Sequence, residues 1–176
     1  MKAFQIIFEE NKALIYSLSF RLLGNRQEAE NLTQEVFLNA FKAYPHFRGE
    51  SKVSTWLYRI AVNLIIKELK RKKLNKFLSL NFLSEESGGT PPIEPVHPGY
   101  GPSAELESKE MERIDQRLIR SLPERQRTAI TLQYYEGLAY EEIASVMEIS
   151  RSSVESLLFR AKQNLEKSLA PYLIDS

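Results

Sequence analysis

Four polar side chains recur at every fourth residue of one predicted helix, and their chemistry suits contact with a nucleic acid. They are Thr55, Arg59, Asn63 and Lys67, and four further cations follow at Lys70–Lys73. Side chains four residues apart lie on one face of a helix. An asparagine amide can both donate to and accept from a base edge, whereas arginine and lysine bind phosphates. A core helix with a solvated face and a basic end has the same pattern. The flanking sequence is therefore needed to choose between a nucleic-acid-binding helix and an ordinary core helix.

The helix that positions this polar stripe also carries an apolar seam. The seam has the i, i+3, i+4, i+7 spacing of a buried amphipathic helix and comprises Val53, Trp56, Leu57, Ile60, Ala61 and Leu64. Because Trp56 belongs to this seam, we expect it to pack in the core rather than to stack on a base.

The charges of the chain are segregated along the sequence. Residues 51–80 hold eight Lys/Arg against one acid, whereas residues 81–116 hold two Lys/Arg against eight acids. The net charge of the whole chain, +1, hides this division. The basic block is a candidate phosphate-contacting surface, although a block that only keeps the chain soluble has the same composition.

Length and composition limit the classes of protein to consider. The chain has 176 residues, 43% of them hydrophobic and 27% charged, which is ordinary for one or two small globular domains. It has no cysteine, which excludes disulfides and thiolate chemistry and fits a reducing cytoplasm. No apolar run approaches the roughly 18 residues of a membrane span, and the N-terminal apolar run is too short for a signal peptide.

Helical periodicity predicts two helical units separated by a linker. Helices over about 3–23 and 26–44, ended by Gly24 and Pro45, precede a short loop and the helix described above. Asn25 with Glu28 three residues later resembles a capping box at the start of the second helix. Five of eight prolines and four of seven glycines then fall within residues 78–103. We therefore expect an all-α fold with domains at 1–77 and 104–176, joined by a flexible linker at 78–103.

The second unit has the spacing of a helix-turn-helix. A short helix over 140–147 is followed by a turn, by Ser150 as N-cap and by a longer helix. In that motif the start of the second helix enters the major groove. The outward residues expected to meet DNA are Arg151, Ser152, Ser153, Glu155 and Ser156, with Arg160 near a phosphate. A plain helical hairpin remains an alternative.

Several stretches resemble those of extracytoplasmic-function (ECF) sigma factors. In the first unit these are residues 27–38 (QEAENLTQEVFL), residues 47–51 (FRGES) and residues 54–63 (STWLYRIAVN). In the second unit they are residues 121–127 (SLPERQR) and 135–144 (YEGLAYEEIA). The matches follow the family's order over about 140 residues, and only the linker lies outside them.

The resemblance implies partners and sites. The first unit would bind the clamp helices of the RNA polymerase β′ subunit, with Gln34, Glu35 and Leu38 as candidates, and the second unit would meet the β flap and the −35 duplex. The −10 strand, with one base flipped out, would be held by residues of the loop and the stripe: Phe47, Arg48, Arg59, Asn63, Lys67 and Lys70. The resemblance also implies a cytoplasmic protein without a cofactor and an anti-sigma factor as a partner.

The second unit departs from the family pattern at four positions. Glu155 and Leu157 stand where basic residues are usual, which predicts weaker phosphate anchoring. Glu148 replaces a common glycine, and Ala139 replaces a Ser/Thr cap at a cost of about 1 kcal/mol. We therefore expect the isolated second unit to be marginally stable.

Two other functions are alternatives to a sigma factor. A stand-alone helix-turn-helix regulator would use the first unit as a sensor or for dimerisation, but the loop-and-stripe arrangement favours single strands. An enzyme is disfavoured because the sequence has no phosphate-binding glycine loop, metal cluster or nucleophile–histidine pair. We interpret both histidines, His46 and His97, as structural.

Overall fold

The computed structural model describes residues 2–83 and 117–174, and these ranges are built from helices without a strand. The elements are α1 (Lys2–Leu23), α2 (Arg26–Ala43), the 3-10 turn η1 (Tyr44–His46), α3 (Val53–Leu83), α5 (Glu124–Tyr134), α6 (Tyr140–Met147) and α7 (Arg151–Ile174). The predicted all-α fold class is confirmed. Most of the expected linker, which includes His97, and the second unit's expected first residues, 104–116, lie outside the described residues. None of the described helices has the length and apolarity to cross a membrane.

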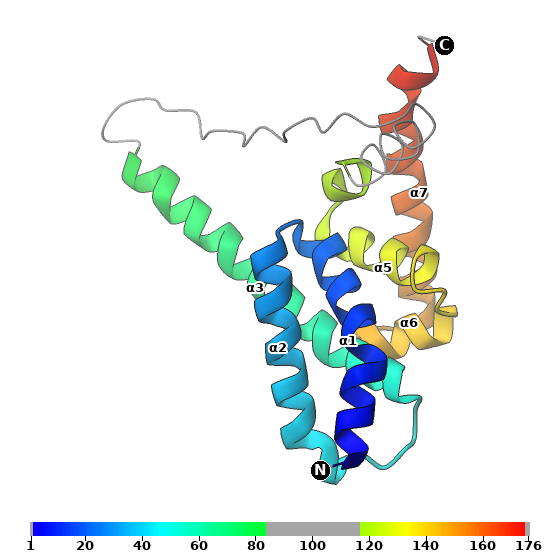
Figure 1. Ribbon diagram of the computed structural model, residues 1–176. Helices are drawn as coiled ribbons and strands as arrows, with labels where there is room; N and C mark the ends of the chain where they lie inside the picture. Colours follow the sequence, from blue (N-terminus) through cyan, green and yellow to red (C-terminus); the bar gives the residue numbers. More distant parts are fainter. Residues whose placement is uncertain (1, 84–116, 175–176) are drawn as a thin grey trace, which may run out of the picture.

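The first unit, residues 2–83, is a bundle of α1, α2 and α3 (Figure 1). Gly24 ends α1 with a φ of 77°, a conformation that glycine adopts without steric cost. The Asn25 side chain then caps α2 by accepting from the Glu28 amide at 3.0 Å, as predicted. The Glu28 carboxylate does not complete the expected capping box but pairs with Lys72 of α3.

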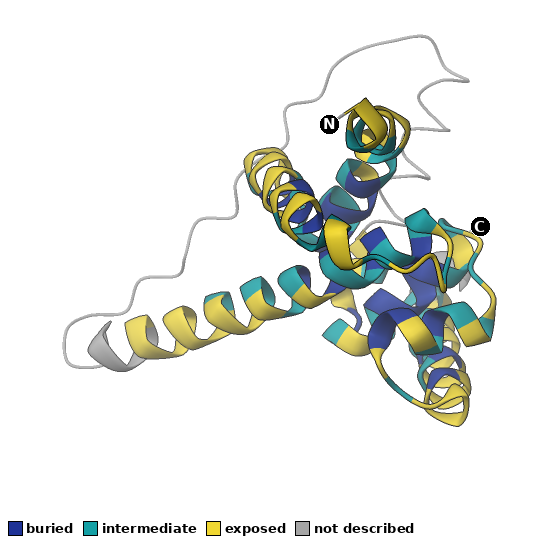
Figure 2. Ribbon diagram, turned by 90° about the horizontal axis from the view of Figure 1, so that it is seen from below, coloured by how far each residue is buried: buried dark blue, intermediate teal, exposed yellow. Residues whose placement is uncertain are grey.

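The core of the first unit forms where its three helices meet. Leu18 and Leu22 of α1, Val36 of α2, and Leu57 and Ile65 of α3 are fully buried. Figure 2 shows buried residues gathered at this crossing, while the far turns of α3 are exposed. The buried face of α3 only partly matches the predicted seam: Leu57 and Ala61 are fully buried, but Val53, Trp56, Ile60 and Leu64 are half-buried. Thr55, predicted for the polar stripe, is buried as well, so only the later part of the stripe, from Asn63 on, faces solvent.

Helix α3 is longer than the sequence analysis expected. The linker was predicted to begin at residue 78, but α3 continues to Leu83. The reason is local, because the chain has neither glycine nor proline between residues 74 and 87 to stop the helix. Its last turns project from the body of the molecule (Figures 1 and 2) and leave Leu74, Phe77 and Leu78 exposed.

The second unit, residues 117–174, contains the predicted helix-turn-helix. Helix α6 has the predicted bounds, and Ser150 caps α7 by accepting from the Ser153 amide at 3.2 Å. The Ala139 amide donates to the Glu142 carboxylate at 3.0 Å, so α6 keeps part of the capping that a serine or threonine would supply. Glu148 ends α6 in the left-handed conformation.

The two units pack against each other. Helix α6 and the end of α5 lie against α3 and α1, on the side of α1 opposite to α2 (Figure 1). Buried side chains of both units, such as Leu22 and Leu132, belong to one continuous apolar cluster. The sequence predicted two tethered units but did not predict this contact.

Candidate nucleic-acid interface

A hollow of about 440 Å³, here called the loop hollow, lies between the loop after η1 and the start of α3. The ring centroids of Phe47 and Trp56 lie 4.6 Å apart, the ring planes are inclined by 31°, and the two rings form an aromatic wall. The hollow is lined by Ala43, His46, Phe47, Arg48, Glu50, Ser51, Trp56, Arg59 and Ser145. Trp56, expected in the core, is half-buried and also lines the hollow, because it stands at the end of the apolar seam next to the loop.

Only some of the residues predicted to bind the −10 element line the loop hollow. Phe47, Arg48 and Arg59 line it, whereas Asn63, one turn further along α3, is exposed and is not among the lining residues. Lys70 is exposed still further along the helix. The stripe therefore leads away from the hollow along α3 and does not form its wall.

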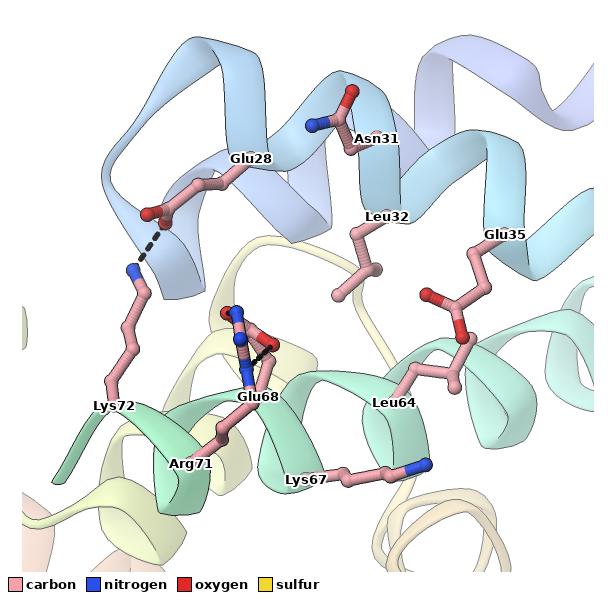
Figure 3. A pocket seen from close by; sticks show the side chains of 9 residues that line it. All are labelled: Glu28, Asn31, Leu32, Glu35, Leu64, Lys67, Glu68, Arg71 and Lys72. Atoms are coloured by element: carbon pink, nitrogen blue, oxygen red, sulfur yellow. Dashed lines mark hydrogen bonds and ion pairs between the residues drawn. The ribbon is translucent and has the colours of Figure 1, made fainter. Parts of the chain in front are cut away.

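A second hollow of about 460 Å³, the α2–α3 hollow, separates the facing sides of these two helices (Figure 3). Glu35 of α2 and Lys67 of α3, predicted for two different partners, line its opposite sides. Its other four charged residues are paired, Lys72 with Glu28 and Arg71 with Glu68 at 2.7 Å. The Arg71 guanidinium lowers the pKa of the Glu68 carboxyl. This hollow thus has a polar, largely neutralised lining.

The outer face of α2 combines polar and apolar side chains. Gln34, Glu35 and Leu38, the predicted polymerase-binding residues, are all exposed, with Leu38 at 54%. Phe41, one turn further on, is 51% exposed and touches Phe4 with ring centroids 5.2 Å apart. Phe41 is not among the predicted polymerase-binding residues, although its spacing from Leu38 places it on the same face.

The predicted DNA-reading residues of α7 share one solvent-facing side. Val154, Leu158 and Ala161 of α7 are buried on the other side. The six predicted residues are all exposed: Arg151, Ser152, Ser153, Glu155, Ser156 and Arg160. Arg151 is held by two carboxylates, Glu141 at 3.0 Å and Glu155 at 3.2 Å.

The contact between the units, here called the inter-unit contact, uses polar side chains from the start of α3. The Tyr58 hydroxyl, on a residue only 2% exposed, donates to Glu136 at 2.6 Å. Burial, together with this bond, raises the pKa of Tyr58, and burial also raises the pKa of Glu136. Next to Tyr58, Arg59 donates to the Ser145 hydroxyl at 2.9 Å, and Lys52, just before α3, pairs with Glu142 at 3.2 Å.

Fold and surface chemistry define the chain as an all-α protein with a helix-turn-helix unit of the DNA-binding type. Comparison with known families makes this more specific. The family model for sigma-70 region 2 matches residues 7–74, and that for sigma-70 region 4 matches residues 116–165. The chain is 36% identical to the ECF RNA polymerase sigma factor SigW of Bacillus subtilis, over 95% of this chain and 89% of that protein. It is 33% identical to the ECF RNA polymerase sigma-E factor of Escherichia coli, over 98% and 89%.

The chain therefore belongs to the ECF sigma factors. It is a transcription initiation factor that binds core RNA polymerase and promoter DNA, and a stand-alone regulator is not favoured. The fold is similar to that of the sigma factor RpoE from Bartonella quintana, solved in complex with the anti-sigma factor NepR. The TM-score is 0.70 at 20% identity, covering 97% of this chain and 98% of that one. CnrH, solved with the cytosolic domain of CnrY, gives a TM-score of 0.65 at 20% identity, covering 97% and 89%.

Proposed function

We propose that the loop hollow receives one unpaired base of the −10 strand after the promoter has been melted. The observation that carries this proposal is the aromatic wall of Phe47 and Trp56 beside two guanidinium groups, Arg48 and Arg59. An unstacked base needs a flat apolar surface and polar groups at its edge, and the adjoining phosphates need cations. The loop hollow is the part of the first unit where these three requirements meet.

The strand then continues along the polar stripe of α3. Asn63, Lys67 and Lys70 lie beyond Arg59 on successive turns of the helix. Asn63 contacts a second base or a sugar on this path, because it lies outside the loop hollow, and the lysines contact phosphates. Together these assignments make the start of α3 the site for the unpaired base and its middle turns the site for the sugar-phosphate backbone of the strand.

The outer face of α2 docks on polymerase. Leu38 and Phe41 give it two exposed apolar side chains, and Gln34 and Glu35 supply a polar rim. An apolar centre with polar neighbours is the usual composition of a protein interface. The clamp helices of β′ are the proposed partner of this face.

The second unit reads the −35 element as duplex through the exposed start of α7. Arg151 has to leave Glu141 or Glu155 before it can contact a guanine. We assign the β flap and an anti-sigma factor as further partners, the latter because a similar fold was solved with an anti-sigma factor. The chain acts without catalysis of its own and beside polymerase in the cytoplasm.

Transcription reconstituted with core polymerase separates the two sites of the first unit. Phe47→Ala should abolish most promoter opening, detected by permanganate reactivity of melted thymines, while polymerase binding stays intact. Leu38→Asp should instead weaken polymerase binding. Phe77→Ala, which removes an exposed aromatic ring from the far end of α3, is the matched control. Normal opening by Phe47→Ala would refute the base site.

A further inference from the structure

The inter-unit contact reaches the same loop hollow that the proposed function assigns to an unpaired base. Ser145 of α6 lines this hollow opposite residues of the first unit. Its hydroxyl also accepts the hydrogen bond of Arg59 at 2.9 Å. A base entering the hollow would meet α6, and Arg59 would have to release Ser145 before it could contact a phosphate.

We propose that the packing of α6 on the start of α3 is a self-inhibited state, in which the second unit engages the beginning of the first unit's strand-binding surface, at Arg59 and the loop hollow. This inference rests on the proposed function for the identity of the blocked site. Two carboxylates support it, since Glu142 pairs with Lys52 at 3.2 Å and Glu136 accepts from Tyr58 at 2.6 Å. Carboxylates and phosphates engage the same donors through charge-assisted bonds. The segment from Glu136 to Ser145 thus competes with nucleic acid for the start of α3.

The inter-unit contact leaves some buried polar atoms without hydrogen bonds, which lowers the free energy needed to open it. Among the described residues, four buried side-chain polar atoms lack a hydrogen-bond partner, and three are the Nε atoms of Arg21, Arg59 and Arg127. All three arginines bridge the units: Arg21 lies 3.8 Å over the Tyr135 ring, and Arg127 donates to the Leu22 carbonyl at 3.3 Å. Buried donors without acceptors cost free energy. Opening returns these three groups to water.

A built-in reporter makes opening measurable. Trp56 is the single tryptophan of the chain and lines the loop hollow beside Ser145. When α6 leaves, the indole becomes more accessible to water and to a soluble quencher. Quenching of its fluorescence by acrylamide therefore follows the open fraction of the full-length protein without a label.

Two independent variants open the contact by different means. Tyr58→Phe with Glu142→Gln leaves the Glu136 carboxylate buried without its donor and removes the charge pair with Lys52, while the amide can still accept from Ala139. Ser145→Lys alters only an exposed residue and sets a second cation against Arg59. Glu141→Gln is the control, because it changes the charge of the same helix by the same amount but pairs with Arg151 within its own unit.

Binding of a fluorescent single-stranded DNA of mixed sequence, without polymerase, is measured alongside quenching. If the open fraction rises from about a tenth to nearly all, the affinity should rise roughly tenfold. Both opened variants should show this rise together with stronger quenching of Trp56, and Glu141→Gln should match the wild type. Circular dichroism checks that each variant keeps its helices.

Unchanged quenching in both opened variants, or stronger quenching without a gain in affinity, would overturn the self-inhibited state. The proposed function has its own control, which is Phe47→Ala added to an opened variant. Loss of the gain in single-strand affinity in this combined variant would assign the strand to the loop hollow. A gain that survives Phe47→Ala would support inhibition by α6 and count against the base site, so the two failures are distinguishable.

Discussion

Replacing Glu148 by glycine should stabilise the second unit, because Glu148 ends α6 in a conformation that glycine adopts more easily. Its φ is 54° and its ψ is 45°, and it is the one non-glycine residue with a positive φ among those described. Its amide donates to the Ala144 carbonyl, so the turn itself is needed to close the helix. The side chain is exposed, and its removal therefore costs little packing.

The size of the effect follows from two opposing contributions. The left-handed conformation costs an L-residue roughly 1–2 kcal/mol. Glycine loses more backbone entropy on folding, which offsets roughly 0.5–1 kcal/mol of that relief. The expected net gain is about 0.5–1 kcal/mol, or about 2–8 °C in Tm if the second unit melts as a domain of 60–100 residues.

Thermal and urea unfolding followed by circular dichroism measure this gain. Glu148→Ala is the matched control, since it removes the same side chain but keeps a Cβ in the left-handed conformation. The glycine variant should be more stable than both the wild type and the alanine variant. A glycine variant no more stable than Glu148→Ala would show that the backbone conformation at Glu148 carries no strain.

Two further perturbations test the electrostatics. Glu155→Lys removes a partner of Arg151 and adds a cation to the start of α7, so nonspecific duplex affinity should rise and the slope of log K against log salt should steepen by about 1–2; an unchanged slope would place this face of α7 away from DNA. Burial raises the pKa of Glu136 above its ordinary 4.5, because the contact favours the protonated carboxyl. The inter-unit contact is therefore strongest below pH 4.5 and weakens as pH rises through the raised pKa. Trp56 quenching should increase over this range, and Glu136→Gln, which keeps an acceptor for Tyr58, should flatten the increase. Glu142 acts in a separate window: the Ala139 amide and Lys52 lower its pKa, and its contribution is lost only as pH falls through that lowered value, below 4.5.

The sequence predicted best the elements that local signals define. Helix α6 matched its predicted bounds because an acidic first turn begins it and a turn ends it, and Ser150 and Asn25 cap their helices as expected. Where no breaker stands, the prediction failed. Helix α3 runs past residue 78, where the linker is predicted to begin, and reaches Leu83, because no glycine or proline stands between residues 74 and 87.

The candidate sites were predictable in their residue types but not in their grouping. Helical spacing put Arg59 and Asn63 on one stripe, yet only Arg59 lines the loop hollow. Trp56 fits the apolar seam by spacing, and only the position of the loop after η1 brings Phe47 against it. The bond between Tyr58 and Glu136 joins residues 78 positions apart, for which local periodicity carries no information.

The two proposals together give an order of events. The outer face of α2 lies away from the second unit (Figure 1), and Leu38 and Phe41 are exposed although the units are packed together. Polymerase can therefore bind the closed protein, while Ser145 of α6 stays at the loop hollow until α6 leaves. A basic surface open at all times would bind nucleic acid indiscriminately, since phosphate contacts are independent of sequence. The pairing of Lys52 with Glu142 and of Arg59 with Ser145 engages two of these cations while the units are packed together, whereas Lys67 and Lys70 stay exposed. Separation of the units on polymerase would release both cations for the strand.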